Sequence, residues 1–514
     1  MSELVIPKYW KSATISECIA KMGLISDGDW IESKDQDPSG SIRLIQLADI
    51  GDGSFRNKSH RFMTKRNAER MNCTFLSVGD VIIARMPDPL GRACIFPEIE
   101  NEAVTVVDIC LIRACSNSAF INKILMHWIN SPEVRNYIAM QSTGTTRKRI
   151  TRKKIEALEL PVPSLAEQKE IATKLDKLLT QVDTIKARLD TIPDILKRFR
   201  QSVLAAAVNG KLTEEWRKKN STDPIGELDV YISDSNNDRK KIEATNHHEI
   251  ITDLIPPNWS ITNFNNLFKF IDYRGKTPKK STKGKRLISA KNIKMGFVQN
   301  EPIEYLSEKD YQSWMTRGFP KPGDIFFVTE GHTMGCVALN ERDDEFALAQ
   351  RTITLQPFNK LNTRFYLYYM LTSQFQRLVE LNATGSAAKG IKAAKFRGLP
   401  TPFPSSKEQD EIVRQIEQLF IFADQIEKRV KDAQTRVNKL TQSILTKAFR
   451  GELTAEWREQ NPDLISGENS AEALLEKIKK EREAIEKAKP KKKRTRIPLR
   501  KNASEALSLI IFEK

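Results

Sequence analysis

A long internal repeat constrains this chain of 514 residues more than any other feature of its sequence. Residues 143–220 align without a gap on residues 384–461, and 28 of the 78 aligned positions are identical. Unrelated segments of this length would share only a handful of residues, so a fixed-offset likeness of this extent indicates a duplicated unit. Upstream of these segments the likeness weakens and the offset drifts. The chain is therefore two copies of one unit, each with a variable front and a constrained back.

The constrained back of each copy has the pattern of a long helix. Apolar residues recur at alternating steps of four and three over residues 171–192 and 412–433. Such a heptad seam favours a partner helix in water. A helix from about residue 166 to 209 would be about 65 Å long, at roughly 1.5 Å per residue. Gly210 and Gly451 follow where a C-terminal cap belongs, and we expect Pro193 to restart or kink the first helix.

Two seams of matching length predict an intramolecular coiled coil. The alternative is that each helix packs on its own domain as ordinary core. The residues expected in the seam, which are also the candidates for partner contacts, are Ile171, Leu175, Leu178, Val182, Ile185, Leu189, Ile412, Ile416, Leu419, Ile426 and Val430.

The variable fronts have the pattern of mixed α/β heads. Matched short strands are predicted at residues 81–84 and 325–328, each preceded by Gly-Asp, and at residues 43–45 and 286–288. Helical segments are predicted at residues 120–130 and 363–371. The expected fold class is therefore α/β, with two globular heads and a pseudo-twofold repeat. The predicted domains are a first head (1–150), a first helical region (151–220), a polar linker (221–254), a second head (255–392), a second helical region (393–461), and a C-terminal helix with a basic tail (462–514).

The composition excludes several classes of protein. Hydrophobic residues at 39% and charged residues at 29% suit a globular chain, and no apolar run approaches the roughly 20 residues of a membrane span. We expect a cytoplasmic protein whose six cysteines are reduced, because they form no CxxC pair or disulfide-scaffold spacing. The five histidines have no zinc-site spacing, so no metal centre is expected.

No catalytic motif survives inspection. The phosphate-binding motif GxxxxGK[ST] is absent. Gly275-Lys276-Thr277 matches its end, but residue 270, where the motif has its first glycine, is Phe. The chain also lacks the Asn or Asp, Pro, Pro and aromatic run of DNA amino-methylases. Pro87-Asp88, followed by Glu98 and Glu100, is similar to the carboxylate set of a nuclease, but the Glu-x-Lys that would complete such a site is missing. We therefore expect a binding protein rather than an enzyme, with no cofactor of its own.

The net charge of +17 is confined to three basic stretches without acids, at residues 147–154, 274–286 and 489–501. Clustered Lys and Arg on loops suit contact with nucleic-acid phosphates, and Arg or Lys can also reach base edges. Residues 274–286, here called the basic loop, are rich in small residues and follow Tyr273; the equivalent stretch of the first copy is acidic. A solvated surface loop is the alternative interpretation.

Residues 143–150 and 384–391 lie at matched positions just before the long helices. Glycine, small hydroxyls and a basic residue suit contact with a DNA backbone, but a hinge between head and helix explains the glycines equally well. The candidate DNA-contacting residues are Arg85, Arg92, Arg147, Lys148, Arg149, Arg152, Tyr273, Arg274, Lys276, Lys279, Lys280, Lys283, Lys285, Arg286, His332 and Lys389.

Two signatures occur in both copies: Pro-x-Pro-x-x-x-Glu-Gln, ending at Gln168 and Gln409, and Gly-x-Leu-Thr-x-x-Trp-Arg, ending at Arg217 and Arg458. With these signatures, the chain resembles the specificity subunits of type I restriction-modification systems over nearly its whole length. Residues 197–202, 441–445 and 461–469 resemble the enterobacterial IA branch of that family.

The resemblance implies that each head is a target recognition domain, and that the helices form an antiparallel coiled coil holding the heads apart over a bipartite DNA target. It also implies two modification subunits, which carry S-adenosylmethionine and methylate adenine at N6, and restriction subunits that use ATP and Mg²⁺ to cut DNA. The alternative is a scaffold that joins proteins through its coiled coil and binds DNA without sequence preference.

Overall fold

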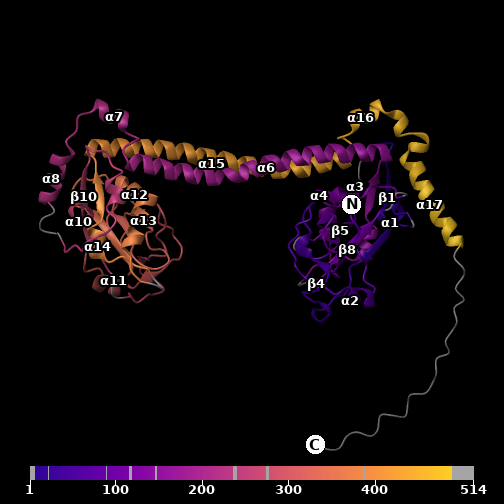
Figure 1. The fold of residues 1–514 in the computed structure, drawn as a ribbon, viewed down its shortest axis with the longest axis horizontal. Coiled ribbons are helices and arrows are strands. Elements are labelled where there is room, and N and C mark those ends of the chain that lie inside the picture. The colour runs from indigo at the N-terminus through magenta and orange to yellow at the C-terminus, as the bar shows by residue number, and fades with distance from the viewer. Residues whose placement is uncertain are drawn as a thin grey trace, which may run out of the picture. The chain divides into compact units, whose positions relative to one another are not determined.

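The structure, a computed structural model, describes residues 6–20, 22–87, 90–114, 118–144, 147–234, 240–273, 277–385 and 389–488. Arg274, Lys276 and the basic tail from residue 489 therefore lie outside the described residues. The chain forms two compact units, one from residues 1–186 and 435–514, the other from residues 187–434. Each unit combines a mixed head with a segment of each of two long helices (Figure 1).

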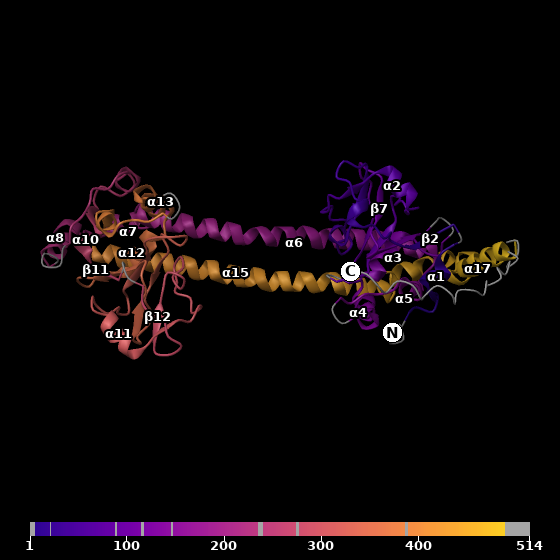
Figure 2. The same ribbon diagram turned by 90° about the horizontal axis from the view of Figure 1, so that it is seen from below.

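The long helices are α6 (Leu165–Val208) and α15 (Ser406–Phe449), each of 44 residues. Within each unit one half of α6 lies beside the opposite half of α15, so the two helices run antiparallel (Figure 2). The coiled-coil prediction is thus confirmed as a packing of two long helices. Each helix is followed by a glycine of positive φ, +69° at Gly210 and +73° at Gly451, which confirms the predicted C-terminal caps. Helix α6 does not restart at Pro193 but continues through it. Because proline has no backbone N–H, one hydrogen bond of the helix is missing there.

The seam is buried at its ends and thinner towards the middle of the helices. In the first unit Ile171, Leu175 and Val182 join one apolar cluster with α15 and the head, while Ile185 is 45% exposed. In the second unit Ile412 and Ile416 share a cluster with the end of α6 and the head. The two alternatives for the helices therefore combine, because each end packs on a head as well as on the other helix. Leu178 and Leu419 are partly buried against these clusters, Val430 is buried, and Leu189 and Ile426 are half-buried.

The two heads have the same sheets in the same strand order, which confirms the mixed α/β class. A four-stranded antiparallel sheet has the order β2-β8-β5-β6 in the first head and β11-β17-β14-β15 in the second. These strands are β2 (Leu24–Asp27), β8 (Ile109–Arg113), β5 (Val81–Ala84), β6 (Ala93–Ile95), β11 (Phe268–Asp272), β17 (Thr352–Pro357), β14 (Ile325–Val328) and β15 (Val337–Leu339).

A second sheet of three strands also repeats, with one antiparallel and one parallel neighbour of its central strand. It contains β4 (Phe62–Met63), β3 (Ile42–Ile45) and β7 (Ala103–Thr105) in the first head, and β13 (Tyr305–Leu306), β12 (Lys285–Ile288) and β16 (Phe346–Leu348) in the second. The strand that leads to each long helix pairs with the first strand of its head: β9 (Glu159–Val162) with β1 (Lys11–Thr14), and β18 (Pro400–Phe403) with β10 (Ser260–Asn263).

The shorter helices also correspond between the copies. The predicted helical segments are confirmed as α3 (Asn122–Ile129) and α12 (Thr363–Met370). The remaining helices of the first unit are α1 (Ile15–Cys18), α2 (Lys65–Arg70), α4 (Pro132–Gln141), α5 (Arg152–Glu156), α16 (Ala455–Gln460) and α17 (Ala471–Ala488). Those of the second unit are α7 (Glu214–Lys219), α8 (Pro224–Asp234), α9 (Glu249–Thr252), α10 (Phe264–Leu267), α11 (Glu308–Trp314), α13 (Ser373–Asn382) and α14 (Ala393–Arg397).

The repeated signatures meet in a buried cluster that joins the two copies within the first unit. Glu167, at the start of α6, accepts hydrogen bonds from Trp10 Nε1 (2.9 Å), Thr454 Oγ1 (2.7 Å) and Arg458 Nε (3.0 Å). Arg458 also donates to the carbonyl of Gly451 (2.6 Å), and its guanidinium lies 5.7 Å from the centre of the Trp10 ring. The start of the first copy's helix is therefore held by the end of the second copy. We call this buried cluster of Trp10, Glu167, Thr454 and Arg458 a clasp.

The second unit has the reciprocal cluster. Glu408 accepts from Trp259 Nε1 (3.0 Å) and Thr213 Oγ1 (2.8 Å) and is paired with Arg217, which donates to the carbonyl of Gly210 (2.8 Å). Both carboxylates are fully buried. The Glu, Gly, Thr and Arg of the signatures thus share one contact geometry, which is used twice with the copies exchanged.

The predicted linker is more ordered than its composition suggested. Within it, α8 buries Leu228 and Tyr231 in the core of the second head, and Glu227 accepts from the backbone N–H and hydroxyl of Ser406 (2.7 and 2.8 Å). The polar stretch lacks an extended apolar pattern because α8 is only 11 residues long. The equivalent segment of the second copy is α17, which packs against α1 and buries Ile478 in the first head.

Candidate nucleic-acid interface

In each head, three segments meet at one end of the four-stranded sheet: the turn that connects two neighbouring strands, a helix and a small hairpin. In the first head these are the turn between β5 and β6, helix α4, and a hairpin closed by mutual backbone hydrogen bonds of Thr143 and Arg149 (3.0 and 2.8 Å). In the second they are the turn between β14 and β15, helix α13, and a hairpin closed in the same way by Thr384 and Gly390 (2.8 and 2.9 Å).

Backbone hydrogen bonds fix each hairpin to the end of the central strand. Ile150 N donates to Arg85 O (3.1 Å), and Ile391 N donates to Thr329 O (2.9 Å). The stretches that we interpreted either as DNA contacts or as hinges are therefore hairpins held on their heads. Contact with DNA by these hairpins stays a prediction.

A glycine lets the turn and the helix approach closely in the second head. Gly335 has φ +87°, and a Cβ atom there would lie 2.3 Å from Gln376 Oε1. Gln376 Nε2 donates to Gly335 O (2.9 Å) and to Met370 O (2.7 Å), which holds the turn against α13. Gly91, with φ +79°, occupies the matched turn of the first head. A non-glycine residue at these positions would be strained by its backbone alone.

Several candidate residues of the first head are engaged by the protein itself. Arg85 is 4% exposed, pairs with Asp27 and donates to Val107 O (3.0 Å). Burial, and next the guanidinium of Arg149, lower the pKa of Arg85. Arg149 donates to the same carbonyl (3.1 Å), and Arg152 pairs with Glu156 (3.1 Å). Among the remaining candidates of this head, Arg92 is buried, whereas Arg147 and Lys148 are exposed.

The basic loop of the second head is partly neutralised by acids that lie far away in sequence. Lys280 pairs with Glu304 (2.8 Å) and Lys285 with Glu345 (2.7 Å). Lys279 and Lys283 are exposed, and within the described residues neither makes an ion pair. Arg286 donates to Asn300 O.

Tyr273, the aromatic residue placed beside this loop, is buried. Its hydroxyl donates to Gly318 O (2.8 Å) and accepts from Arg317 N (2.9 Å), and its ring stacks on Trp314. The side chain therefore packs in the second head, and a contact with DNA would require it to leave these partners. Its DNA contact stays a prediction.

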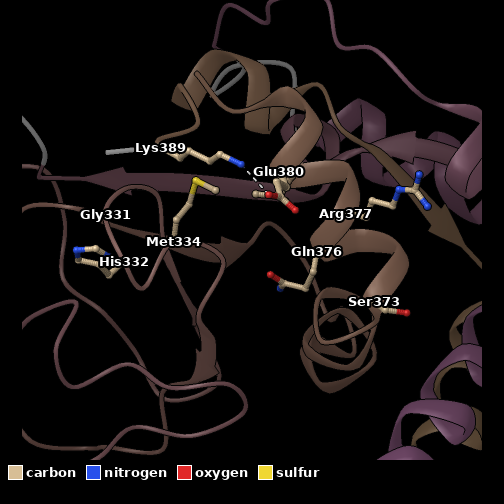
Figure 3. A pocket seen from close by; sticks show the side chains of 9 residues that line it. Gly331, His332, Met334, Ser373, Gln376, Arg377, Glu380 and Lys389 are labelled. Atoms are coloured by element: carbon tan, nitrogen blue, oxygen red, sulfur yellow. Dashed lines mark hydrogen bonds and ion pairs between the residues drawn. The ribbon is translucent and has the colours of Figure 1, made fainter. Parts of the chain in front are cut away.

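His332 and Lys389 lie at an open pocket of about 730 Å³ between the turn, α13 and the hairpin (Figure 3). Lys389 pairs with Glu380 across the pocket edge (2.7 Å), and this ion pair lowers the pKa of Glu380. The pocket is lined by Gly331, His332, Met334, Ser373, Gln376, Arg377, Val379, Glu380 and Lys389.

Seven of these residues were not among the candidates, and four of the seven are polar residues of α13: Ser373, Gln376, Arg377 and Glu380. They lie at positions i, i+3, i+4 and i+7 of α13, which is one polar face of an amphipathic helix. That periodicity is visible in the sequence and could have identified them. The position of His332 against this face could not be predicted from the local sequence, because it depends on how β14 lies in the sheet.

Comparison with known proteins agrees with the duplicated architecture. The family model described as type I restriction modification DNA specificity domain matches twice, at residues 7–194 and 256–434. The EcoBI specificity subunit of Escherichia coli is 38% identical over 396 residues, which are 76% of this chain and 77% of that protein. The StySPI specificity subunit of Salmonella potsdam is 40% identical over 364 residues, 70% and 71% of the two chains.

Two solved structures share the fold. The HsdS subunit of Thermoanaerobacter tengcongensis superposes with a TM-score of 0.53 and 17% identity over 87% of this chain and 98% of that one. A chain from a study of complex assembly and conformational transition of the type I R-M system gives 0.55, with 15% identity over 87% and 99%. Among the described helices, none is both long and apolar enough to cross a membrane.

Proposed function

The chain belongs to the type I restriction-modification DNA specificity family, and from this premise we propose that it recognises a bipartite DNA target, with one head for each half-site. The observation that carries the proposal is the duplication itself. The two heads share strand order and the parallel or antiparallel pairing of their strands, yet they carry different side chains at matched surface positions. A common frame with different surfaces suits two readers of different sequences.

The long helices support a spacer between the half-sites. Each has 44 residues and runs without a break from one unit into the other. Such a helix is about 66 Å long at roughly 1.5 Å per residue. Major-groove contacts on one face of DNA lie about one helical turn apart or a multiple of it, so a fixed helix length would restrict the length of the spacer.

In this proposal the chain itself catalyses nothing. Modification subunits would methylate adenine at N6 with S-adenosylmethionine, and restriction subunits would hydrolyse ATP with Mg²⁺ and cut DNA. The division of labour is that of the family, whose specificity subunits assemble with both partners. The DNA-contacting residues would come from the exposed basic positions of the two heads, among them Arg147, Lys148, Lys279 and Lys283.

The test is to express the chain with the products of its neighbouring genes and to map adenine methylation on genomic DNA. We expect a bipartite motif with a spacer of fixed length. The second head, residues 255–385, should then be replaced by that of another family member. One half of the motif should change and the other half should stay. Methylation without a sequence motif would favour the scaffold alternative, and a change in both halves would contradict independent recognition.

A further inference from the structure

The open pocket beside α13 combines chemical groups that a simple phosphate site would not. Arg377 is a pure hydrogen-bond donor, Glu380 is an acceptor, and Ser373 and His332 can act as either. Met334 adds apolar surface. A site for the DNA backbone needs only donors and positive charge. Donors, acceptors and apolar contacts together match the edges of bases in the major groove, where each base pair presents its own combination of these groups.

The side chains that line the pocket come from three segments that are each held in place. Gln376 fixes the turn to α13, and Gly331 N donates to Lys389 O (3.0 Å), which fixes the hairpin to the turn. Figure 3 shows His332 and Met334 on the side of the turn, and Ser373, Gln376 and Arg377 on the side of the helix. A pocket with fixed walls costs little further ordering when it binds a ligand.

A comparison of α13 with its counterpart α4 separates constant from variable positions. At the constant offset of 241 residues, Arg377 corresponds to Asn136, Glu380 to Ala139 and Ser373 to Pro132. The buried positions remain apolar: Phe375 and Val379 correspond to Val134 and Ile138. The helix is therefore the same structural element in both heads, with its exposed chemistry exchanged.

One polar position of this surface is identical in both heads. Lys389 corresponds to Lys148, and both side chains are exposed on the hairpin. A phosphate contact is independent of base sequence, so it can be the same in two heads that recognise different half-sites. A contact with a base edge could be the same in both heads only if the two half-sites shared that base.

We propose that the pocket between α13 and the β14–β15 turn is the base-recognition site of the second head, with Arg377, Glu380 and His332 as specificity-determining residues and Lys389 as the adjoining phosphate contact. The assignment rests on the proposed function and specifies where in the second head the second half-site is recognised. The contacts expected of these groups are an arginine that donates to guanine O6 and N7, and a carboxylate that accepts from cytosine N4.

The test gives the pocket the residues of the first head. Arg377→Asn and Glu380→Ala should be made singly in the full chain, expressed with its partner subunits, and adenine methylation should be mapped on genomic DNA. We expect each variant to accept other bases at one or two positions of the second half-site, with discrimination reduced roughly 5- to 150-fold there. The first half-site should be unchanged. Lys389→Ala should lower methylation at all sites without changing base preference.

Lys360→Ala is the matched control, because it removes an exposed lysine of the same head outside the pocket. It should leave the motif unchanged. If Arg377→Asn and Glu380→Ala also keep the full motif, or if they change the first half-site, the pocket is not the base-recognition site. If the unmodified chain with its partners directs no motif at all, the proposed function has failed. That outcome is distinct from a motif that these variants do not alter.

Discussion

Replacing Arg458 with methionine should loosen the first unit and leave the second unit intact. Arg458 lies at the end of the second copy, yet its guanidinium contacts Glu167 at the start of the first helix (2.9 Å). Methionine retains most of the length and apolar volume of the arginine stem but removes all five donors. The change therefore isolates the charged contact.

The magnitude follows from the burial of the pair. The Glu167 side chain has no exposed surface, and the Arg458 side chain is 13% exposed. Without the guanidinium, the carboxylate keeps only Trp10 and Thr454 as neutral donors. Breaking a buried ion pair by removing one partner costs about 3 to 5 kcal/mol. At the lower bound of about 3 kcal/mol, the equilibrium constant for local opening rises roughly 150-fold.

Hydrogen exchange followed by mass spectrometry measures this opening locally, which matters because a protein of two units need not unfold in one step. Peptides that cover residues 159–175 should exchange roughly 100-fold faster in Arg458→Met, while those covering residues 400–416 should not change. Arg217→Met is the mirror-image control and should reverse the pattern. Glu167→Gln combined with Arg458→Met should exchange more slowly than Arg458→Met alone, because no uncompensated charge is then buried.

Equal acceleration in both units would show that the clasps do not act locally. An acceleration below about threefold in residues 159–175 would show that the buried pair contributes little to the closed state. Either result would refute the reasoning.

Three further predictions concern other parts of the chain. Burial raises the pKa of Asp324 to about 6; its contribution to stability is complete below the unfolded value near 3.8 and is lost as the pH rises through 6. Calorimetry should therefore show Asp324→Asn gaining about 2 to 3 kcal/mol over the unmodified protein between pH 4 and pH 7. Asp80→Asn should instead destabilise at pH 7, because it breaks the ion pair with Arg113 (2.6 Å); the same sign for both variants would contradict this. Removing one heptad from each long helix should shorten both by about 10 Å and shorten the preferred spacer in methylation maps, or abolish binding. An unchanged spacer at full activity would rule out the helices as a ruler. Lys279 and Lys283 are exposed and make no ion pair with any residue that the structure describes. Replacing each with alanine should lower the log-log salt slope of DNA binding by about 0.9, whereas removing residues 489–514 should weaken binding uniformly or hardly at all. A truncation that abolished sequence discrimination would contradict the assignment of recognition to the heads.

The helices and the matched strands could be predicted because their signals are local and repeated. The heptad steps indicate both α6 and α15, and the range predicted for the first helix, about 166 to 209, agrees with α6 to within a residue at each end. The strands at residues 81–84 and 325–328 follow from short apolar runs after Gly-Asp. Repetition doubles every such signal, because an accidental pattern in one copy would not recur in the other.

The clasps and the charge of the basic loop could not be predicted, because their partners are far apart in sequence. Nothing local to Glu167 indicates that its cation lies 291 positions later. Likewise, the partners of Lys280 and Lys285 are acids brought close by neighbouring strands and loops. Burial of Tyr273 has the same origin. The polar face of α13 is the exception, because its periodicity is local.

The reciprocal clasps set an order of events while the chain is being synthesised. Glu408 finds Thr213 and Arg217 already made, 195 and 191 positions behind it, whereas Glu167 waits for Thr454 and Arg458, 287 and 291 positions ahead. At about 5 to 20 residues per second, that wait is roughly 15 to 60 s on the ribosome. The unit that begins first is therefore completed last. Until translation passes residue 458, the start of α6 carries a carboxylate without its cation. A product released after residue 434 and before residue 454 would contain the whole second unit but would lack both Thr454 and Arg458 as partners of Glu167.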